Sequence, residues 1–163
     1  MIGFFETEPQ LSFNDIKEIE NYVGLTFPDE YKIHLIKYNG GRCFPNVFKF
    51  IENDELAESH IEWFNAIYDG EYNNMKWSIE VYKLDEKRMP KNILPIASDG
   101  LGNEICISCG GIDLGYVYFW DHEKEVDYDE SDDSNYSNLS LIAKSFNEFI
   151  DGLYEDDEEE YLL

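Results

Sequence analysis

The chain reads Gly-Tyr-Val-Tyr-Phe-Trp from residue 115 to residue 120, and this stretch decides the fold. Successive side chains of a β-strand point to opposite faces, so Val117 and Phe119 share one face while the tyrosines and Trp120 share the other. Large apolar side chains on both faces are typical of a strand that is covered on both sides. We therefore predict a central strand over residues 115–120, with packed layers above and below it.

Other strand patterns precede this one. Residues 93–97 form a short apolar run, and residues 104–108 alternate between polar and apolar side chains. The turn Asp99-Gly100-Leu101-Gly102-Asn103 separates the two, because glycine adopts a positive φ at little cost. Residues 47–51 alternate loosely and also fit a strand.

Two short helices are predicted near the N-terminus. Ser12 is suited to capping a helix over residues 12–23, which Gly24 ends. A second helix begins near Pro28, where a first-turn proline loses no hydrogen bond, and ends at Asn39-Gly40-Gly41. The short connection between them predicts a helical hairpin.

The remaining segments give less uniform patterns. Residues 55–68 suggest a helix, and residues 73–84 fit either a helix or a strand. A last helix is predicted over residues 139–153. Its apolar face consists of Ile142, Phe146, Phe149, Ile150 and Leu153.

Length and composition indicate one globular unit. The chain has 163 residues, of which 43% are hydrophobic and 16% are aromatic. This length fits one domain of ordinary size, and each aromatic side chain can bury a large area. Because no repeat or linker divides the sequence, we expect residues 1–163 to form a single domain.

Charge is the unusual feature of the composition. The chain has 36 Asp and Glu against 12 Lys and Arg, a formal net charge of -24. A field of this sign repels nucleic-acid phosphates and anionic membranes, so we expect neither as a partner. The same field attracts basic proteins and speeds their encounter. The simpler interpretation, that the charge only keeps the protein soluble, stays open.

Acidic residues concentrate in two places. Residues 154–163 form an acidic C-terminal tail, and residues 121–138 form an acidic loop. We predict that residues 121–133 of the loop contact a partner, with carboxylates setting the encounter rate and an aromatic supplying anchoring energy. The alternative is that the loop is only solvated and the contact surface lies elsewhere. The predicted contact residues are Asp121, Glu123, Glu125, Asp127, Tyr128, Asp129, Glu130, Asp132 and Asp133.

The cysteines do not form a recognisable chemical site. Cys106 and Cys109 are spaced as C-x-x-C, but the pair spans a strand end and a turn, without the helix N-terminus that lowers a thiol pKa. A structural zinc site needs a second ligand pair, and Cys43 and the three histidines provide none. We expect a buried strand cysteine and a turn cysteine.

Other chemical motifs are incomplete. Asp127, Asp129, Ser131 and Asp133 have the spacing of a calcium loop, but Asp132 stands where that loop needs glycine. The sequence has no nucleophile elbow, phosphate loop or dinucleotide fingerprint. We therefore expect no enzyme activity, no metal and no cofactor.

Targeting signals are also missing from the sequence. No apolar run is long enough to span a bilayer, and residues 1–5 lack the basic lead of a signal peptide. Three cysteines, an odd number, do not suit a disulfide framework. We expect a cytoplasmic location.

The stretches described above, taken in order, resemble the SUKH superfamily, which comprises bacterial immunity proteins and the related yeast Smi/Knr cell-wall regulators. The resemblance covers nearly the whole chain and is weakest over residues 52–92. It rests on Leu25-Thr26-Phe27-Pro28-Asp29-Glu30-Tyr31, Tyr38-Asn39-Gly40-Gly41, Leu94-Pro95-Ile96-Ala97 with Asp99-Gly100-x-Gly102-Asn103, Gly115-Tyr116-Val117-Tyr118-Phe119-Trp120-Asp121-His122-Glu123, and Ala143-Lys144-Ser145-Phe146-x-x-Phe149.

These motif residues have structural explanations, so they identify a fold more securely than a function. We expect structural roles for Pro28, Tyr31, Asn39, Gly40, Gly41, Pro95, Asp99, Gly102, Gly115, Trp120, Ser145, Phe146 and Phe149. The resemblance implies an α+β fold with a mixed or antiparallel sheet flanked by helices.

The resemblance also implies a function. Most bacterial members are immunity proteins that block a cognate polymorphic toxin by direct binding, and nucleases are common among these toxins. A nuclease groove is basic, so it suits an acidic partner. The alternative implied by the eukaryotic relatives is a non-enzymatic regulator or scaffold in cell-wall assembly.

Overall fold

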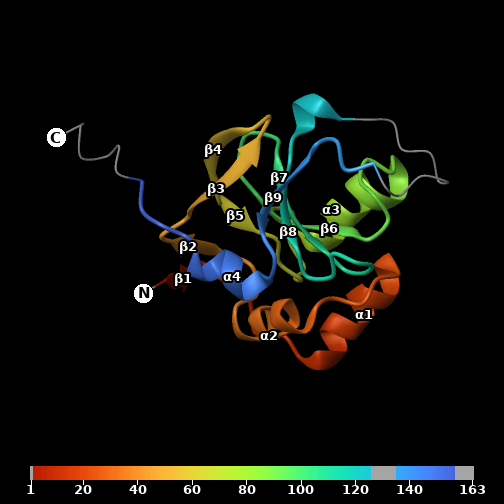
Figure 1. The fold of residues 1–163 in the computed structure, drawn as a ribbon. Coiled ribbons are helices and arrows are strands. Elements are labelled where there is room, and N and C mark those ends of the chain that lie inside the picture. The colour runs from red at the N-terminus through yellow and green to blue at the C-terminus, as the bar shows by residue number, and fades with distance from the viewer. Residues whose placement is uncertain (1, 126–134, 157–163) are drawn as a thin grey trace.

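The computed structural model describes residues 2–125 and 135–156. Its main feature is a five-stranded antiparallel sheet in the order β5-β6-β7-β8-β9 (Figure 1). Two antiparallel ribbons, β1–β2 and β3–β4, accompany it. The strands are β1 (Gly3–Phe5), β2 (Arg42–Phe44), β3 (Val47–Glu52), β4 (Glu55–His60), β5 (Trp63–Phe64), β6 (Ile93–Ser98), β7 (Glu104–Ser108), β8 (Val117–Trp120) and β9 (Leu139–Ala143).

Strand β8 lies inside the sheet, between β7 and β9, and all four of its residues are buried. Val117 and Phe119 belong to the larger apolar cluster, whereas Tyr118 and Trp120 belong to a smaller cluster on the other face. The prediction of a strand covered on both sides is confirmed. So is the α+β fold with an antiparallel sheet flanked by helices.

The N-terminal helices form where the sequence predicts them. Helix α1 (Phe13–Val23) starts with a reciprocal cap: the Asp15 amide donates to Ser12 Oγ at 3.3 Å, and the Ser12 amide donates to Asp15 Oδ2 at 2.8 Å. It ends at Gly24, whose φ of 75° is left-handed. Helix α2 (Asp29–Lys37) has Pro28 at its N-cap, one position earlier than a first-turn proline.

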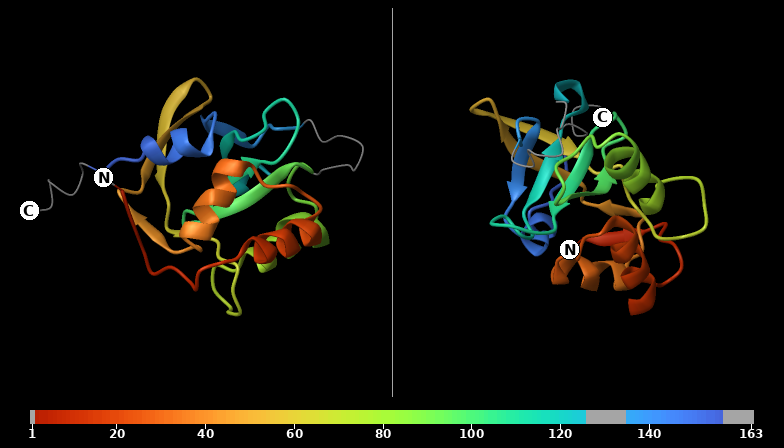
Figure 2. Two further views of the ribbon diagram at one scale, coloured as in Figure 1. Left: turned by 90° about the horizontal axis from the view of Figure 1, so that it is seen from below. Right: turned by 90° about the vertical axis from the view of Figure 1, so that its right-hand side faces the viewer.

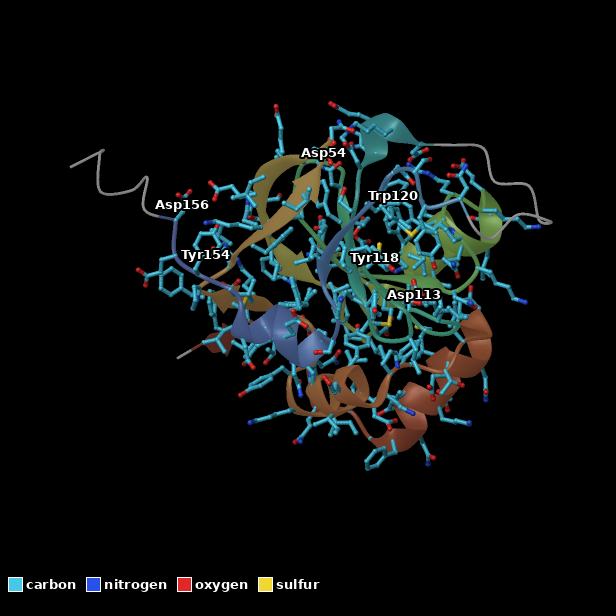
Figure 3. All side chains as sticks on the ribbon, in the orientation of Figure 1. Asp54, Asp113, Tyr118, Trp120, Tyr154 and Asp156 are labelled. Carbon is cyan, nitrogen blue, oxygen red and sulfur yellow. The ribbon has the colours of Figure 1, made fainter. Side chains whose placement is uncertain are left out.

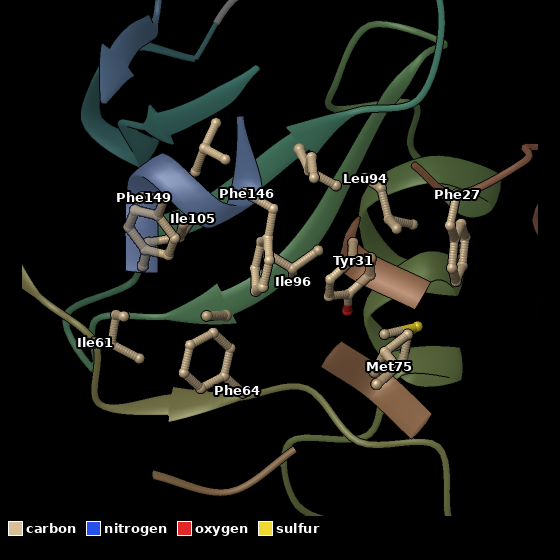
Figure 4. Packing of buried hydrophobic residues seen from close by; sticks show 14 of the residues in the cluster. Phe27, Tyr31, Ile61, Phe64, Met75, Leu94, Ile96, Ile105, Phe146 and Phe149 are labelled. Atoms are coloured by element: carbon tan, nitrogen blue, oxygen red, sulfur yellow. The ribbon is translucent and has the colours of Figure 1, made fainter. Parts of the chain in front are cut away.

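The larger cluster joins these helices to the sheet (Figure 4). Tyr31 of α2 packs against Phe146 of α4 (Phe146–Asp151), with ring centroids 5.4 Å apart. The ring centroid of Phe149 in α4 lies 5.9 Å from that of Phe48 in β3. Aromatic packing therefore connects the N-terminal hairpin, the C-terminal helix and the β3–β4 ribbon in one core.

The predicted helix over residues 55–68 is wrong. Residues 55–60 form β4, which pairs with β3, and Trp63–Phe64 form β5. The reason is the turn Asn53-Asp54, whose φ angles of 52° and 63° are those of a two-residue hairpin turn. The apolar residues whose spacing suggested a helix belong to β4, which pairs with β3, and to β5, which pairs with β6 in the main sheet.

The open choice for residues 73–84 resolves as helical. Asn74 caps α3 (Met75–Ile79), its side chain accepting from the Trp77 amide at 3.3 Å. The π-helix η1 (Glu80–Asp85) continues from α3. This segment brings Tyr82 to the smaller cluster on the second face of the sheet.

The predicted helix over residues 139–153 is only partly right. Leu139–Ala143 form β9, which pairs with β8, and the helix begins only after Ser145. The Ser145 hydroxyl accepts from the Glu148 amide at 3.1 Å and caps α4. Pairing with β8 therefore takes the first five residues of the segment into the sheet.

The molecule has two dissimilar ends. Helices α1 and α2 lie together at one end, and the tip of the β3–β4 hairpin lies at the opposite end beside η2 (His122–Lys124) (Figures 1 and 2). Figure 3 places Asp54 at the hairpin tip, close to that short helix. The segment directly after β8 lies at this second end, which contains the candidate site.

Candidate partner-binding site

Three of the nine predicted contact residues are described by the structure, and all three directly follow β8. Asp121 precedes η2, Glu123 lies within it, and Glu125 follows it. The other six, Asp127, Tyr128, Asp129, Glu130, Asp132 and Asp133, lie outside the described residues.

Asp121 fixes the start of this segment. Its Oδ1 accepts from the Glu123 amide at 2.9 Å and so caps η2. Its own amide donates to the Asn138 carbonyl at 3.0 Å, and Asn138 Nδ2 donates to the Asp121 carbonyl at 3.3 Å. These bonds tie Asp121 to the residue before β9, so it has a structural role in addition to its charge.

A second support comes from the turn before β7. The buried Asp99 carboxylate accepts from the Leu101 amide at 2.8 Å, the Asn103 amide at 3.1 Å and Asn103 Nδ2 at 2.8 Å. Asn103 Oδ1 in turn accepts from the His122 amide at 3.1 Å and lies 2.6 Å from His122 Nδ1. Asp99 therefore positions η2 through Asn103.

Gly102 is required by the same arrangement. Its φ is 96°, and a Cβ at this position would stand 3.2 Å from the His122 ring. Gly102 is therefore needed for two reasons: the turn requires its positive φ, and the His122 ring leaves little room for a side chain. His122 itself contacts Asn103 and borders no described metal-binding group.

The β3–β4 hairpin lies against η2. The Lys124 ammonium forms an ion pair with the Glu52 carboxylate at the end of β3. Asp54 and Glu55 are exposed at the adjoining turn. These hairpin carboxylates were not predicted from the sequence, because residues 55–68 were expected to form a helix. The Asn53-Asp54 pair is the local signal that indicates a hairpin turn between β3 and β4.

A hollow of about 410 Å³ lies between the hairpin and the β8–β9 connection. Carboxylates of Glu52 and Asp121 line it together with Lys124, and Ile51 and Leu141 supply apolar lining. Its remaining lining residues are Asn53, Ser137, Asn138, Leu139 and Ser140. We call this hollow, together with Asp54, Glu55, Glu123 and Glu125, the acidic end.

Arg88 binds Glu125, the last described residue of the acidic end before residue 126. Its Nε donates to Glu125 Oε1 at 3.0 Å, and its guanidinium lies 4.7 Å from the Tyr82 ring centroid and 5.4 Å from that of Trp120. The hydrogen bond to Glu125 raises the pKa of Arg88. Glu125 is therefore fixed to the second face of the sheet by a cation that also stacks on two aromatic rings.

Strand β7 contributes a buried carboxyl group, that of Glu104, on the face of the sheet that carries Trp120 and packs against Tyr82. Glu104 is 6% exposed, and burial raises the pKa of its carboxyl to about 8, although a hydrogen bond from Tyr82 opposes the shift. The group is thus mostly protonated at neutral pH. A neutral carboxyl in this position contributes hydrogen bonding to the smaller cluster rather than charge to the acidic end.

The family-motif residues occupy structural positions. Asn39 is 2% exposed and joins three segments: its Nδ2 donates to the Pro9 and Ile67 carbonyls at 2.9 and 2.8 Å, and its Oδ1 accepts from the Ile67 amide at 2.8 Å. Ser145 caps α4, and Pro95 lies at an irregularity in the β6–β7 pairing. Tyr31, Trp120, Phe146 and Phe149 are buried in the two apolar clusters, and Gly115 has a φ of 87°.

Two consecutive glycines follow Asn39 for a steric reason. A Cβ on Gly40 would stand 2.5 Å from the Ala66 Cβ, and one on Gly41 would stand 2.5 Å from the Phe5 carbonyl oxygen. Both residues also have positive φ, at 70° and 87°. The chain after α2 can pass these neighbours only without side chains.

Cys106 and Cys109 lie in a strand and in the turn after it, as predicted. Cys106 is buried in β7 and Cys109 is buried just after it. Burial raises the pKa of both thiols, in Cys109 to about 12, which disfavours the reactive thiolate. In residues 2–125 and 135–156, no group of three or more His, Cys, Asp or Glu is arranged to hold a metal ion. The calcium-like pattern over residues 127–133 lies outside the described residues.

The arrangement defines an α+β protein in which a doubly covered antiparallel sheet supports a carboxylate-rich end. The chain belongs to the SMI1 / KNR4 family (SUKH-1), whose model matches residues 10–152. A relative from Bacillus subtilis (strain 168), the SPbeta prophage-derived uncharacterized protein YokK, is 31% identical over 166 residues, which cover 91% of this chain and 78% of the relative. In the part of the chain that the structure describes, no helix is long and apolar enough to cross a membrane.

Proposed function

We propose that this chain is an immunity protein that neutralises a cognate polymorphic toxin by binding it directly through the acidic end. The observation that carries the proposal is the combination of a net charge of -24 with carboxylates held on a braced surface. Such a surface suits a basic protein and repels polyanions. The chain needs no catalytic step for this role.

Rigidity supports the proposal. Asp121, His122 and Glu125 are each bonded to a different neighbour: Asn138, Asn103 and Arg88. A surface that is already ordered loses little conformational entropy when a partner binds. The carboxylates that follow β8 are therefore suited to tight and fast binding.

The favoured target is a toxin with a basic groove, of which a nuclease is the leading example. A nuclease holds a polyanion, so its groove presents Lys and Arg. An acidic protein seated there blocks substrate entry without chemistry. The family match and the prophage origin of the relative agree with this role.

The decisive experiment tests the proteins encoded beside this gene for a toxin that this chain neutralises. Co-expression should restore growth of cells that produce the toxin, and purified proteins should bind with a Kd of about 10 nM or tighter. Unchanged toxicity at stoichiometric amounts of this chain would overturn the proposal. Co-purification instead with cell-wall assembly proteins, and no toxin gene nearby, would favour the regulator interpretation.

Two matched triple variants locate the contribution of charge. Asp54→Asn, Glu55→Gln and Glu123→Gln neutralise exposed carboxylates of the acidic end. Glu18→Gln, Asp69→Asn and Glu71→Gln neutralise three exposed carboxylates elsewhere. Each set changes the formal charge from -24 to -21. The first set should slow association roughly tenfold at low ionic strength and much less at high salt, and the second set should have little effect. Equal effects would contradict the assignment to the acidic end.

A further inference from the structure

We infer that the hollow of the acidic end is the seat for one lysine or arginine side chain of the toxin, flanked by an aliphatic residue, and that Lys124 occupies this seat until the toxin displaces it. This inference rests on the proposed function. It names the anchor point within the acidic end and the chemistry of the segment that enters it.

The chemistry of the lining selects the occupant. Among the residues that line the hollow, Glu52 and Asp121 are anionic and Lys124 alone is cationic. The ion pair between Lys124 and Glu52 shows that an ammonium group fits against the lining carboxylate. The volume of about 410 Å³ is large enough for the end of one long side chain, since pockets of about 300 Å³ and more hold small-molecule ligands. A second cation supplied by the toxin would compete for Glu52.

Apolar side chains beside the hollow indicate what accompanies that cation. Ile51 and Leu56 lie opposite each other in the β3–β4 register and are 58% and 65% exposed. Leu141 of β9 is 38% exposed and lines the hollow with Ile51. Exposed aliphatic residues beside a charged hollow gain free energy when an apolar partner covers them. An aliphatic neighbour of the toxin cation would meet this requirement.

The location agrees with the charge on the rest of the surface. Asp54 and Glu55 follow the lining residue Asn53 in the hairpin, Glu123 precedes the lining residue Lys124, and Figure 3 places Asp54 at this end of the molecule. These exposed carboxylates steer a basic protein, whereas the hollow and its apolar border hold it once it arrives. Steering and holding therefore depend on different residues, and the two can be separated by measurement.

The first test replaces the aliphatic border. Ile51→Ser with Leu56→Ser should raise the dissociation rate of the complex with the neighbouring toxin about tenfold and leave the association rate unchanged. The matched control is Ile33→Ser with Leu114→Ser, which removes aliphatic side chains that are 68% and 57% exposed on other surfaces. Because all four side chains are exposed, each variant should keep the circular dichroism spectrum of the parent chain.

The second test removes the resident cation. Lys124→Gln leaves Glu52 available, so the toxin should dissociate about fivefold more slowly. Lys37→Gln, an exposed lysine of α2, makes the same change in net charge at the other end of the molecule and should leave dissociation unchanged. Faster dissociation of the Lys124→Gln variant would show that Lys124 contacts the toxin directly, which contradicts its displacement.

The outcomes separate this inference from the proposed function. If the parent chain does not protect cells from the toxin, the proposed function fails, and the inference fails with it. If it protects, but the Ile51/Leu56 variant binds as well as its control, only the inference is overturned. Sedimentation of the purified chain tests whether a second copy of this chain occupies the hollow instead. If the Ile51/Leu56 variant only converts a dimer to a monomer, the hollow is an interface between two copies, and the inference is wrong.

Discussion

Glu104 and Trp120 lie directly opposite each other on β7 and β8, and each has one buried polar atom without a hydrogen-bond partner among the described residues: Oε2 of the carboxyl and Nε1 of the indole. Tyr82 packs edge-on against the Trp120 ring, with centroids 5.4 Å apart. Arg88 covers the same two rings. The buried carboxyl therefore lies in an apolar, aromatic environment, which is the main cause of its raised pKa.

Glu104→Gln should remove a pH dependence from the free energy of unfolding. The pKa of Glu104 rises from 4.5 to about 8 on folding, so the folded chain binds more protons between these values. Stability from this group is fully present below about pH 4.5 and is lost as pH rises to about 8. Urea unfolding at pH 5 and pH 8 should show the variant gaining roughly 3 kcal/mol relative to the parent chain across this interval. Parallel stability curves would contradict the raised pKa, and Glu18→Gln, at an exposed position, is the control.

The three inner strands of the main sheet, β6, β7 and β8, were predictable from the sequence because local pattern and tertiary role agree there. Val117 and Phe119 alternate with Tyr118 and Trp120, and the two pairs pack on opposite faces as expected. Residues 139–143 were not predictable in this way. Their helix-like apolar spacing with Phe146 is real, but pairing with β8 outweighs it and Ser145 starts the helix later.

Only one chain segment of the candidate site, the one after β8, was predicted from the sequence. The acidic composition indicated Asp121, Glu123 and Glu125. The hairpin that completes the acidic end depends on a tertiary contact between Glu52 and Lys124, which are 72 positions apart. No local pattern reports a contact of that separation. The hollow likewise depends on β3 lying beside β9 without belonging to its sheet, which the sequence does not indicate.

His34→Phe should reduce the loss of stability in acid. His34 packs among the rings of Phe4, Phe64 and Phe146, and burial lowers its pKa from 6.5 to about 4. The unfolded chain therefore binds more protons between these values, so stability falls as pH drops from about 6.5 to 4. Unfolding midpoints at pH 7 and pH 4.5 should show a smaller difference for the variant than for the parent chain. An unchanged difference would mean that His34 does not titrate as described.

Asn39→Ala should destabilise the fold by about 3 kcal/mol, because it leaves the partly buried Ile67 amide and two carbonyls without their side-chain partner. Chemical unfolding of the purified variant measures the loss. Asn147→Ala, at an exposed position of α4, is the matched control and should change stability by less than about 0.5 kcal/mol. A loss as small as that of the control would show that solvent readily replaces the Asn39 bonds.

Arg88→Gln should release Glu125 from the second face of the sheet. The change removes the ion pair with Glu125 and the stacking of the guanidinium on Tyr82 and Trp120, at a cost of about 1 kcal/mol because Arg88 is partly exposed. Hydrogen exchange should rise in residues 121–125, and the tryptophan emission should shift because Trp120 loses its cationic neighbour. Arg88→Lys keeps the charge but loses the planar stacking and the forked hydrogen bonds, so it should fall between the parent chain and Arg88→Gln. If both variants exchange as slowly as the parent chain, Asp121 and Asn103 alone hold this segment, and Arg88 contributes only local packing.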